Sequence, residues 1–112
     1  MITQFKIFEK YDIILELHKG DFVLIKVEPN HIFILSGMEE KYFIDFVNNT
    51  IGEIIYVNKV HWNIKVKYND IPSTIKSAFN DDTYIFSPNR VYEFGRTREE
   101  LFMKLNARKY NL

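Results

Sequence analysis

The chain contains no cysteine among its 112 residues. This absence excludes disulfide bonds and thiolate metal ligands, and it is typical of proteins in a reducing compartment, so we expect a cytoplasmic location. No apolar run approaches the ~20 residues that a membrane-spanning helix needs. The first twenty residues carry charges throughout and have no small-residue cleavage site. We therefore expect neither a membrane span nor a secretory signal.

Glycine and proline are also scarce, with four and three copies. The sequence shows no linker, low-complexity run or internal repeat, and its length fits one domain. Aromatic side chains are abundant instead, since they make up 16% of the chain within a hydrophobic fraction of 46%. Large rings are typical of β-sheet surfaces and of the interior of small barrels.

An excess of charge of one sign is absent too, because 15 basic and 15 acidic residues give a formal net charge of zero. Residues 1–60 carry six basic and nine acidic side chains, a net −3, whereas residues 83–112 carry six and three, a net +3. A neutral chain lacks the basic footprint of a non-specific nucleic-acid binder. The basic C-terminal part is either a solvated helix face or a local binding surface.

The most regular pattern lies in residues 60–69, where apolar and polar side chains alternate. The apolar positions are Val60, Trp62, Ile64, Val66 and Tyr68. A period of two predicts a β-strand with one face in the core and the other in water. The apolar run 51–57, followed by a short turn at 58–59, predicts the first strand of a hairpin. In this register Trp62 is a core anchor, so Trp62→Ala is expected to cost roughly 3–5 kcal/mol.

Two helix-capping motifs predict the longer helices. The S-x-x-E motif that starts at Ser36 predicts a helix over residues 38–47, and the T-x-x-E motif that starts at Thr97 predicts a terminal helix over residues 98–109. The residues expected to face inward are Tyr42, Phe43, Phe46 and Val47 in the first helix, and Leu101, Lys104, Leu105 and Arg108 in the second.

Shorter patterns predict the remaining elements. Strands are expected over residues 22–28, 32–35, 83–87 and 91–94, with a tight turn at 87–90. One or two helical turns are expected after Pro72, which suits a first helical turn. Gly52 is expected to permit a close backbone approach in the hairpin. Residues 1–20 are expected either to cover the sheet or to attach loosely.

Two of these runs resemble a known architecture. In TIGEII (Thr50–Ile55) a glycine precedes an apolar strand, and in IKVKY (Ile64–Tyr68) the next strand alternates. Both resemble the centre of KOW-type barrels, which are Src-homology-3-like (SH3-like). The resemblance implies a mainly β, α+β fold with one or two short helices: a small SH3-like antiparallel barrel over residues 21–96, an N-terminal segment at 1–20, and a C-terminal helix and tail at 97–112.

A second resemblance rests on three blocks: FKIFE (Phe5–Glu9), the stretch from IGEI to VKYNDIP (Ile51–Pro72), and the stretch from EFGRTREEL to NARKYNL (Glu93–Leu112). They are similar to a group of small accessory proteins of tailed bacteriophages. The resemblance implies action in the host-cell cytoplasm on a host protein, for example as an inhibitor of a host defence system or enzyme. It supplies no catalytic residue and no cofactor.

The sequence contains no pattern typical of a metal site, a phosphate-binding loop or a catalytic site. His18, His31 and His61 lie far apart, without the spacing of metal ligands. No glycine-rich phosphate-binding loop occurs. Adjacent acids, as in Glu99 and Glu100, are explained by the preference of carboxylates for helix starts. We therefore expect a protein that is not an enzyme and that has no metal and no cofactor.

Two classes of function stay open. A neutral, aromatic-rich chain without catalytic residues is typical of a protein-binding module. The alternative is a KOW-like nucleic-acid-binding barrel, in which Tyr56, Tyr84 and Tyr92 would stack on bases. The cations of this alternative are Lys59, His61, Lys65, Lys67, Arg90, Arg96 and Arg98. The lysines of residues 60–69 also have a simpler explanation, since lysine solvates a strand and prevents edge pairing.

Overall fold

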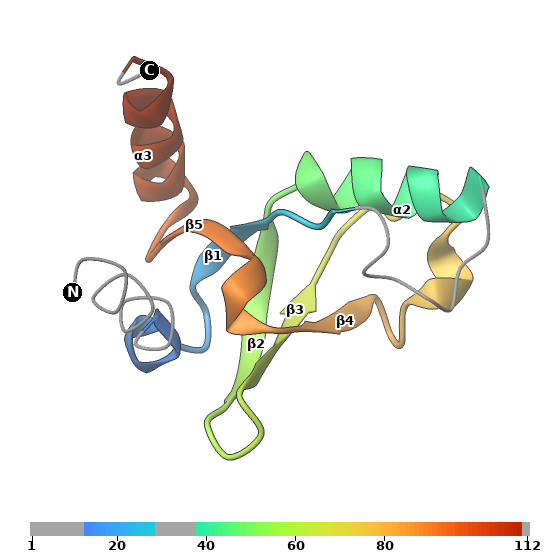
Figure 1. Cartoon of the computed structure of the whole chain (residues 1–112), viewed down its shortest axis with the longest axis horizontal. Helices are drawn as coiled ribbons and strands as arrows, with labels where there is room; N and C mark the ends of the chain where they lie inside the picture. Colours follow the sequence, from blue (N-terminus) through green and yellow to red (C-terminus); the bar gives the residue numbers. More distant parts are fainter. Residues whose placement is uncertain (1–12, 29–37, 111–112) are drawn as a thin grey trace.

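The computed structural model describes residues 13–28 and 38–110, which form a five-stranded antiparallel sheet with helices at its ends (Figure 1). The strands are β1 (Phe22–Ile25), β2 (Gly52–Asn58), β3 (Asn63–Lys67), β4 (Thr83–Phe86) and β5 (Val91–Gly95). The helices are α2 (Met38–Asn48) and α3 (Arg98–Tyr110), with 3-10 turns η1 (Lys76–Ala78) and η2 (Pro88–Arg90). This architecture confirms a mostly β, α+β fold with a C-terminal helix.

Several predictions from the sequence concern residues outside this described part. They are the course of residues 1–12, the strand at 32–35, and the positions of His31 and of the capping residue Ser36. Within the described part, residues 13–16 form a helical turn in which Ile14 is buried.

The sheet has the strand order β4-β3-β2-β1-β5, so the first strand lies between the second and the last. Among the described residues, β4 pairs only with β3 and β5 only with β1. The sheet is therefore antiparallel as predicted, and no ladder between β4 and β5 closes it. Strand β1 is shorter than the predicted 22–28, because after Ile25 only the Lys26 amide continues the pairing, to the carbonyl of Arg90 at 2.9 Å.

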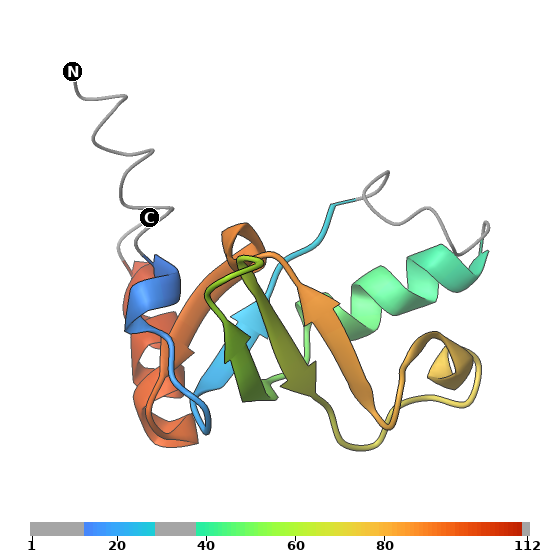
Figure 2. The ribbon, with the colours of Figure 1, turned by 90° about the horizontal axis from the view of Figure 1, so that it is seen from below.

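The two long helices lie at opposite ends of the long axis of the molecule (Figures 1 and 2). Helix α2 lies over the end of the sheet that carries η1, whereas α3 stands beside β5 and β1. The prediction for α2 is confirmed for Phe43 and Val47, which are buried, and for Phe46, which is half-buried. It is wrong for Tyr42, which is exposed because it lies on the flank of this apolar stripe.

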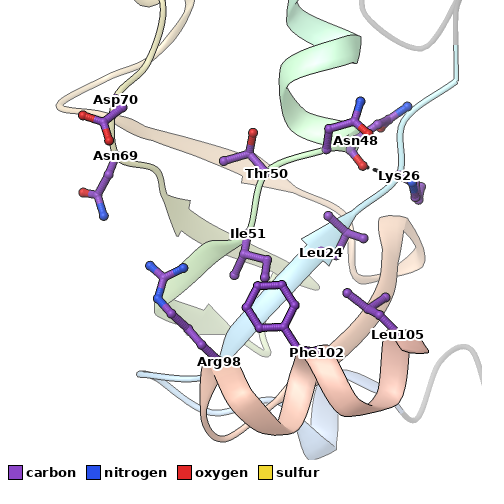
Figure 3. A pocket seen from close by; sticks show the side chains of 11 residues that line it. Leu24, Lys26, Asn48, Thr50, Ile51, Asn69, Asp70, Arg98, Phe102 and Leu105 are labelled. Carbon is purple, nitrogen blue, oxygen red and sulfur yellow. Dashed lines mark hydrogen bonds between the residues drawn. The ribbon is translucent and has the colours of Figure 1, made fainter. Parts of the chain in front are cut away.

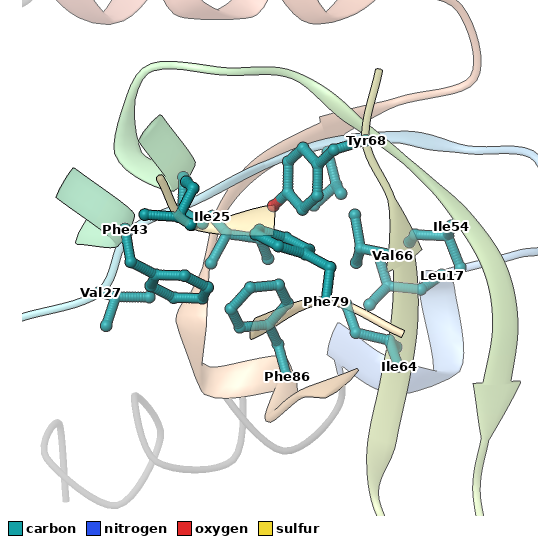
Figure 4. Close-up of a cluster of buried hydrophobic side chains, with 13 residues drawn as sticks. Leu17, Ile25, Val27, Phe43, Ile54, Ile64, Val66, Tyr68, Phe79 and Phe86 are labelled. Atoms are coloured by element: carbon teal, nitrogen blue, oxygen red, sulfur yellow. The ribbon is translucent and has the colours of Figure 1, made fainter. Parts of the chain in front are cut away.

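The core forms between one face of the sheet and α2 (Figure 4). The alternation in β3 is confirmed at Ile64, Val66 and the following Tyr68, which are all buried. Aromatic rings fill the space toward the helix: the centroid of Phe43 lies 5.4 Å from that of Phe79, and the Tyr68 centroid lies 5.9 Å from Phe79. Edge-on and tilted contacts of this kind stabilise the core beyond the area that they bury.

Trp62 is not in this core. Strand β3 begins at Asn63, and residues 59–62 form the hairpin turn, where Trp62 has φ = 54° and is 46% exposed. The strand is therefore shorter than the predicted 60–69, the turn predicted at 58–59 covers residues 59–62, and the predicted core position of the indole is wrong. The cause is Asn58, whose side-chain oxygen accepts the amide protons of Val60 at 3.1 Å and His61 at 3.0 Å. An Asn that binds the backbone ahead of it favours a turn over an extended strand.

Helix α3 begins at Arg98 as predicted and ends at Tyr110, one residue beyond the predicted end. The Thr97 hydroxyl accepts the Glu100 amide proton at 3.0 Å, while the Glu100 carboxylate accepts the Arg96 amide proton at 2.9 Å. Leu101 is buried against the sheet, and the Lys104 ammonium donates to the carbonyl of Phe94 at 3.0 Å. The prediction of an inward stripe is confirmed for Leu101, while Lys104 and Leu105 are half-buried. It is wrong for Arg108, which is exposed because its guanidinium lies over the ring of Tyr92 at the surface.

The segment between β3 and β4 contains one short helical turn. η1 covers Lys76–Ala78, and the residues on either side of it, Ile75 and Phe79, are buried. The tight turn before β5 is η2, where the Ser87 hydroxyl accepts the Asn89 amide proton at 3.3 Å. η2 therefore lies where Ser87 and Pro88 predicted a turn. The helical turn predicted to begin at Pro72 begins instead at Lys76, because residues 73–75 form a non-helical turn.

Candidate functional site

The outer face of the sheet carries a row of three side chains that the register places side by side. Tyr56 in β2 lies opposite Lys65 in β3, and Lys65 lies opposite Ile85 in β4. Lys65 points away from the core because its neighbours Ile64 and Val66 point into it. Tyr56 and Ile85 are 54% and 55% exposed. An aromatic ring and an aliphatic side chain thus flank a cation on a surface that faces solvent.

A shift of register within β2 produces this row. The pairing moves from Ile54–Val66 to Tyr56–Lys65, so Ile55 is the additional residue of a bulge. Without the bulge, strict alternation after the buried Ile54 would turn Tyr56 toward the core. The bulge therefore presents this ring to solvent.

The tip of the hairpin extends the same surface beyond the body of the sheet (Figure 1). Lys59 and His61 are exposed at the tip, and Val60 is 82% exposed. Lys67 adds a further exposed cation at the other end of β3, opposite Glu53. We refer to the following residues together as the hairpin surface: Tyr56, Lys59, Val60, His61, Trp62, Lys65, Lys67 and Ile85.

The structure divides the cations that the sequence proposed for nucleic-acid binding. Four of them, Lys59, His61, Lys65 and Lys67, belong to the hairpin surface. Arg90, Arg96 and Arg98 lie at the other edge of the sheet, beside β5 and α3. Strands β2 and β1 separate the two groups.

The arginines at that edge have intramolecular contacts. The Arg96 guanidinium binds the buried carboxylate of Asp21 and donates to the carbonyl of Glu16 at 3.1 Å. The Arg98 guanidinium lies 4.8 Å from the centroid of the Phe22 ring. These contacts join the N-terminal segment to α3, which gives both arginines a structural role.

The three tyrosines proposed for stacking are also separated. Tyr56 belongs to the hairpin surface. Tyr84 packs at the edge of the core, 4.9 Å from the Phe43 centroid, and burial raises its pKa. The ring of Tyr92 is covered by Arg108, whose guanidinium carbon lies 4.1 Å from the centroid. One of the three tyrosines is therefore available on the face that carries the lysines.

A second surface feature is a groove between α3, β1 and the loops at 48–51 and 69–70 (Figure 3). This part has a volume of about 500 Å³, and a neighbouring part of about 330 Å³ continues it along α3. Both parts contain Leu24, Lys26, Phe102 and Leu105. We call the two parts together the α3 groove. Its remaining lining residues include Asn48, Ile51, Asp70, Tyr92, Arg98, Arg108 and Lys109.

Sequence reasoning missed two contributors to these surfaces. Ile85 was assigned to a strand, but its exposure depends on its register against Lys65. Phe102 is not part of the predicted inward stripe of the terminal helix, and the structure leaves it 53% exposed over the groove. Alternation with Tyr84 and Phe86, whose rings pack in the core, places Ile85 on the outer face. The sequence carries no signal for the groove.

The described residues contain no group of three or more histidine, aspartate or glutamate side chains that could hold a metal ion. Across residues 13–28 and 38–110, no helix has the length and apolar character to cross a membrane. Comparisons of the chain with protein-family models, with curated proteins and with solved structures find no match.

Proposed function

We propose that this chain is a non-enzymatic protein-binding module that docks onto an acidic surface of a partner protein through the hairpin surface. The main observation is the row Tyr56–Lys65–Ile85, whose two apolar members are exposed, together with the exposed tip of the same hairpin. Monomeric proteins rarely expose several large apolar side chains together unless these bind something. Tryptophan and tyrosine are also the residues that most often dominate binding energy at protein interfaces.

The aliphatic side chains of the hairpin surface favour a protein partner over a nucleic acid. Val60 and Ile85 are among the most exposed apolar side chains described here. Bases stack on flat aromatic rings, whereas branched aliphatic groups fit apolar pockets of proteins. The cations Lys59, Lys65 and Lys67 surround these groups and complement an acidic partner surface. The side chain of Asn58 holds the tip in one conformation, which lowers the entropic cost of binding.

The wider proposal follows the two sequence resemblances. The strand order, which pairs the first strand with the last, supports an SH3-like barrel. The 3-10 turn η2 between β4 and β5 agrees with the order of elements in such barrels. A phage accessory protein of this kind would act on a host protein in the host cytoplasm, as an inhibitor of a defence system or enzyme.

The test compares the natural chain with a hairpin variant in the same capture experiment. The variant Tyr56→Ser/Ile85→Ser removes the apolar row while leaving every cation in place. Nuclease-treated bacterial lysate is passed over each immobilised chain, and captured proteins are quantified by mass spectrometry. A partner that the natural chain retains is then purified, and we expect the double variant to bind it at least tenfold more weakly, about 1.4 kcal/mol.

Met103→Ala is the matched control for this experiment. Met103 is exposed on α3, outside the hairpin surface. Its loss should leave the affinity unchanged, while circular dichroism verifies that both variants fold. If the double variant retains the partner with the affinity of the natural chain, the hairpin surface is not the docking site.

The second candidate function is binding of single-stranded nucleic acid by the same face. The observation that favours it is the placement of four basic residues of the predicted set beside the exposed rings of Tyr56 and Trp62. Trp62 is the sole tryptophan, so stacking on it would quench the protein's indole fluorescence. Binding of labelled RNA or DNA oligonucleotides should weaken steeply between about 50 mM and 200 mM salt. Undetectable binding at the lower concentration rejects this candidate.

A further inference from the structure

We propose that the α3 groove is a second binding site, which takes a short acidic peptide segment of a partner protein. The groove is separate from the hairpin surface, since the two have no residue in common. Its charge is strongly one-sided. The cations that line it are Lys26, Arg98, Arg108 and Lys109, and the one acidic lining residue is Asp70.

Contacts other than salt bridges hold two of these cations in place. The Lys26 ammonium donates to the carbonyl of Asn48 at 3.0 Å and lies 5.3 Å from the centroid of the Tyr92 ring. The Arg98 guanidinium lies against the ring of Phe22. An ammonium has three donors and a guanidinium five, so both groups keep donors for a carboxylate. Cations fixed before binding lose less entropy when the ligand arrives.

Arg108 is held in a similar way, although a carboxylate takes part. Its guanidinium covers the ring of Tyr92 and donates to the carbonyl of the same residue. It also contacts the Glu93 carboxylate at 3.4 Å. Glu93 therefore offsets part of this positive charge at the far end of the groove. Asp70 does the same in the part that contains Lys26 and Arg98, so the lining of both parts keeps a net positive charge.

Apolar side chains supply the other half of the site. The ring of Phe102 extends over the groove toward Ile51 and Leu24, and Leu105 follows it along the helix (Figure 3). An apolar side chain of the ligand would cover this ring. The elongated, open shape fits an extended segment in which one apolar residue is flanked by carboxylates. A nucleic acid fits less well, because Lys26 and Arg108 already lie against the other ring in the groove, that of Tyr92.

The test uses the full chain labelled with ¹⁵N and a defined probe. The probe is a synthetic peptide with the repeat Glu-Asp-Phe-Glu-Asp-Leu, and its control has Gln and Asn in place of the acids. At about 50 mM salt, where charges are weakly screened, we expect the acidic peptide to shift the amide signals of Leu24, Phe102 and Leu105. The neutral peptide should leave these signals unchanged, and about 300 mM salt should weaken binding at least fivefold.

Paired variants assign the binding to the groove. Phe102→Ser removes the exposed ring and Lys26→Gln removes a charge, and each should weaken the acidic peptide at least fivefold. Met103→Ser changes a more exposed residue of the same helix and should bind as the natural chain does. The proposal is overturned if the acidic peptide shifts no groove signal, if Phe102→Ser binds it normally, or if an RNA oligonucleotide shifts the same signals more strongly.

This inference and the proposed function fail independently. The hairpin variant Tyr56→Ser/Ile85→Ser should bind the acidic peptide normally, because its substitutions lie outside the groove. If that variant lost peptide binding, the α3 groove and the hairpin surface would not be separate sites. Retained peptide binding, combined with unaltered capture of the partner protein, would reject the hairpin surface and leave the groove standing.

Discussion

Asp21 and Arg96 form an ion pair that joins the residue before β1 to the residue before the cap of α3. The Asp21 carboxylate is 4% exposed, and the same oxygen that binds the guanidinium also accepts the amide proton of His18 at 2.8 Å. Arg96 reaches further, to the carbonyl of Glu16. One half-exposed arginine thus connects the N-terminal helical turn, the first strand and the last helix.

Loss of Arg96 should therefore cost more stability than loss of a neighbouring arginine. Arg96→Ala leaves a buried carboxylate oxygen with a single donor, which should lower the free energy of unfolding by about 1–3 kcal/mol. Arg98→Ala, the matched control, removes an exposed contact with Phe22 worth about 0.5–1 kcal/mol. Urea unfolding followed by circular dichroism measures both values. Equal losses for the two variants would show that the buried carboxylate does not depend on Arg96.

Glu100 should make α3 sensitive to acid. The hydrogen bond from the Arg96 amide, with help from Lys104, holds the pKa of this carboxyl below its usual value of 4.5. The folded state therefore prefers the ionised form, so this contribution is present above pH 4.5 and is lost as the pH falls below it. Glu100→Ala should be less stable than the natural chain at pH 7, and the difference should shrink on acidification. If the difference in stability between the two chains stayed constant from pH 7 to pH 3, the folded state would not prefer the ionised form of Glu100.

Gly52 should tolerate no side chain at the start of β2. An added Cβ would lie 2.9 Å from Cε1 of Tyr68 and closer still to the side chain of Val66. Because both neighbours are buried in the core, Gly52→Ala should destabilise the fold by about 1–3 kcal/mol. The exposed neighbour provides the control, since Glu53→Ala should change stability by about 0.5 kcal/mol or less. Thermal unfolding of the two variants gives the comparison, and an unperturbed Gly52→Ala would mean that the strands are not packed this closely.

Tyr68 carries a buried hydroxyl that has no hydrogen-bond partner among the described residues. Tyr68→Phe removes this unsatisfied group and keeps the ring contacts, so the variant should be as stable as the natural chain or more stable by roughly 1 kcal/mol. Burial also raises the pKa of the Tyr68 hydroxyl above its usual value of 10.0. The natural chain should lose stability relative to the variant as the pH rises above 10.0, because only the unfolded state ionises freely there. A clear loss of stability in Tyr68→Phe at pH 7 would reveal a missed partner.

The sequence predicted those parts of the fold that depend on neighbouring residues. The alternation of Ile64 and Val66, the cap at Thr97 and the turn at Ser87 are all local patterns, and the structure contains each of them. The ion pair between Asp21 and Arg96 could not be predicted in this way. Its partners are 75 positions apart, and nothing in either local sequence indicates the other.

The surfaces were predictable only where they follow from a single hairpin. Lys65 and Lys67 occupy the polar phase of an alternating strand, and the structure leaves both on the outer face. The exposure of Tyr56 depends on a bulge in β2, and that of Ile85 depends on its pairing with β3. The α3 groove is formed by segments from five parts of the chain, so no local pattern indicates it.

Trp62 provides the sharpest comparison between the sequence pattern and the structure, because alternation alone makes it a core residue. The structure places it in the hairpin turn with nearly half of its surface exposed, so Trp62→Ala should cost about 1 kcal/mol or less. Ile64→Ala, two positions along in the same apolar phase, should cost about 2–5 kcal/mol because Ile64 is fully buried. Since Trp62 is the sole tryptophan, unfolding of both variants is followed by circular dichroism. If the two variants lost equal stability, the indole would have to be packed in the core, and the hairpin tip would not belong to the hairpin surface.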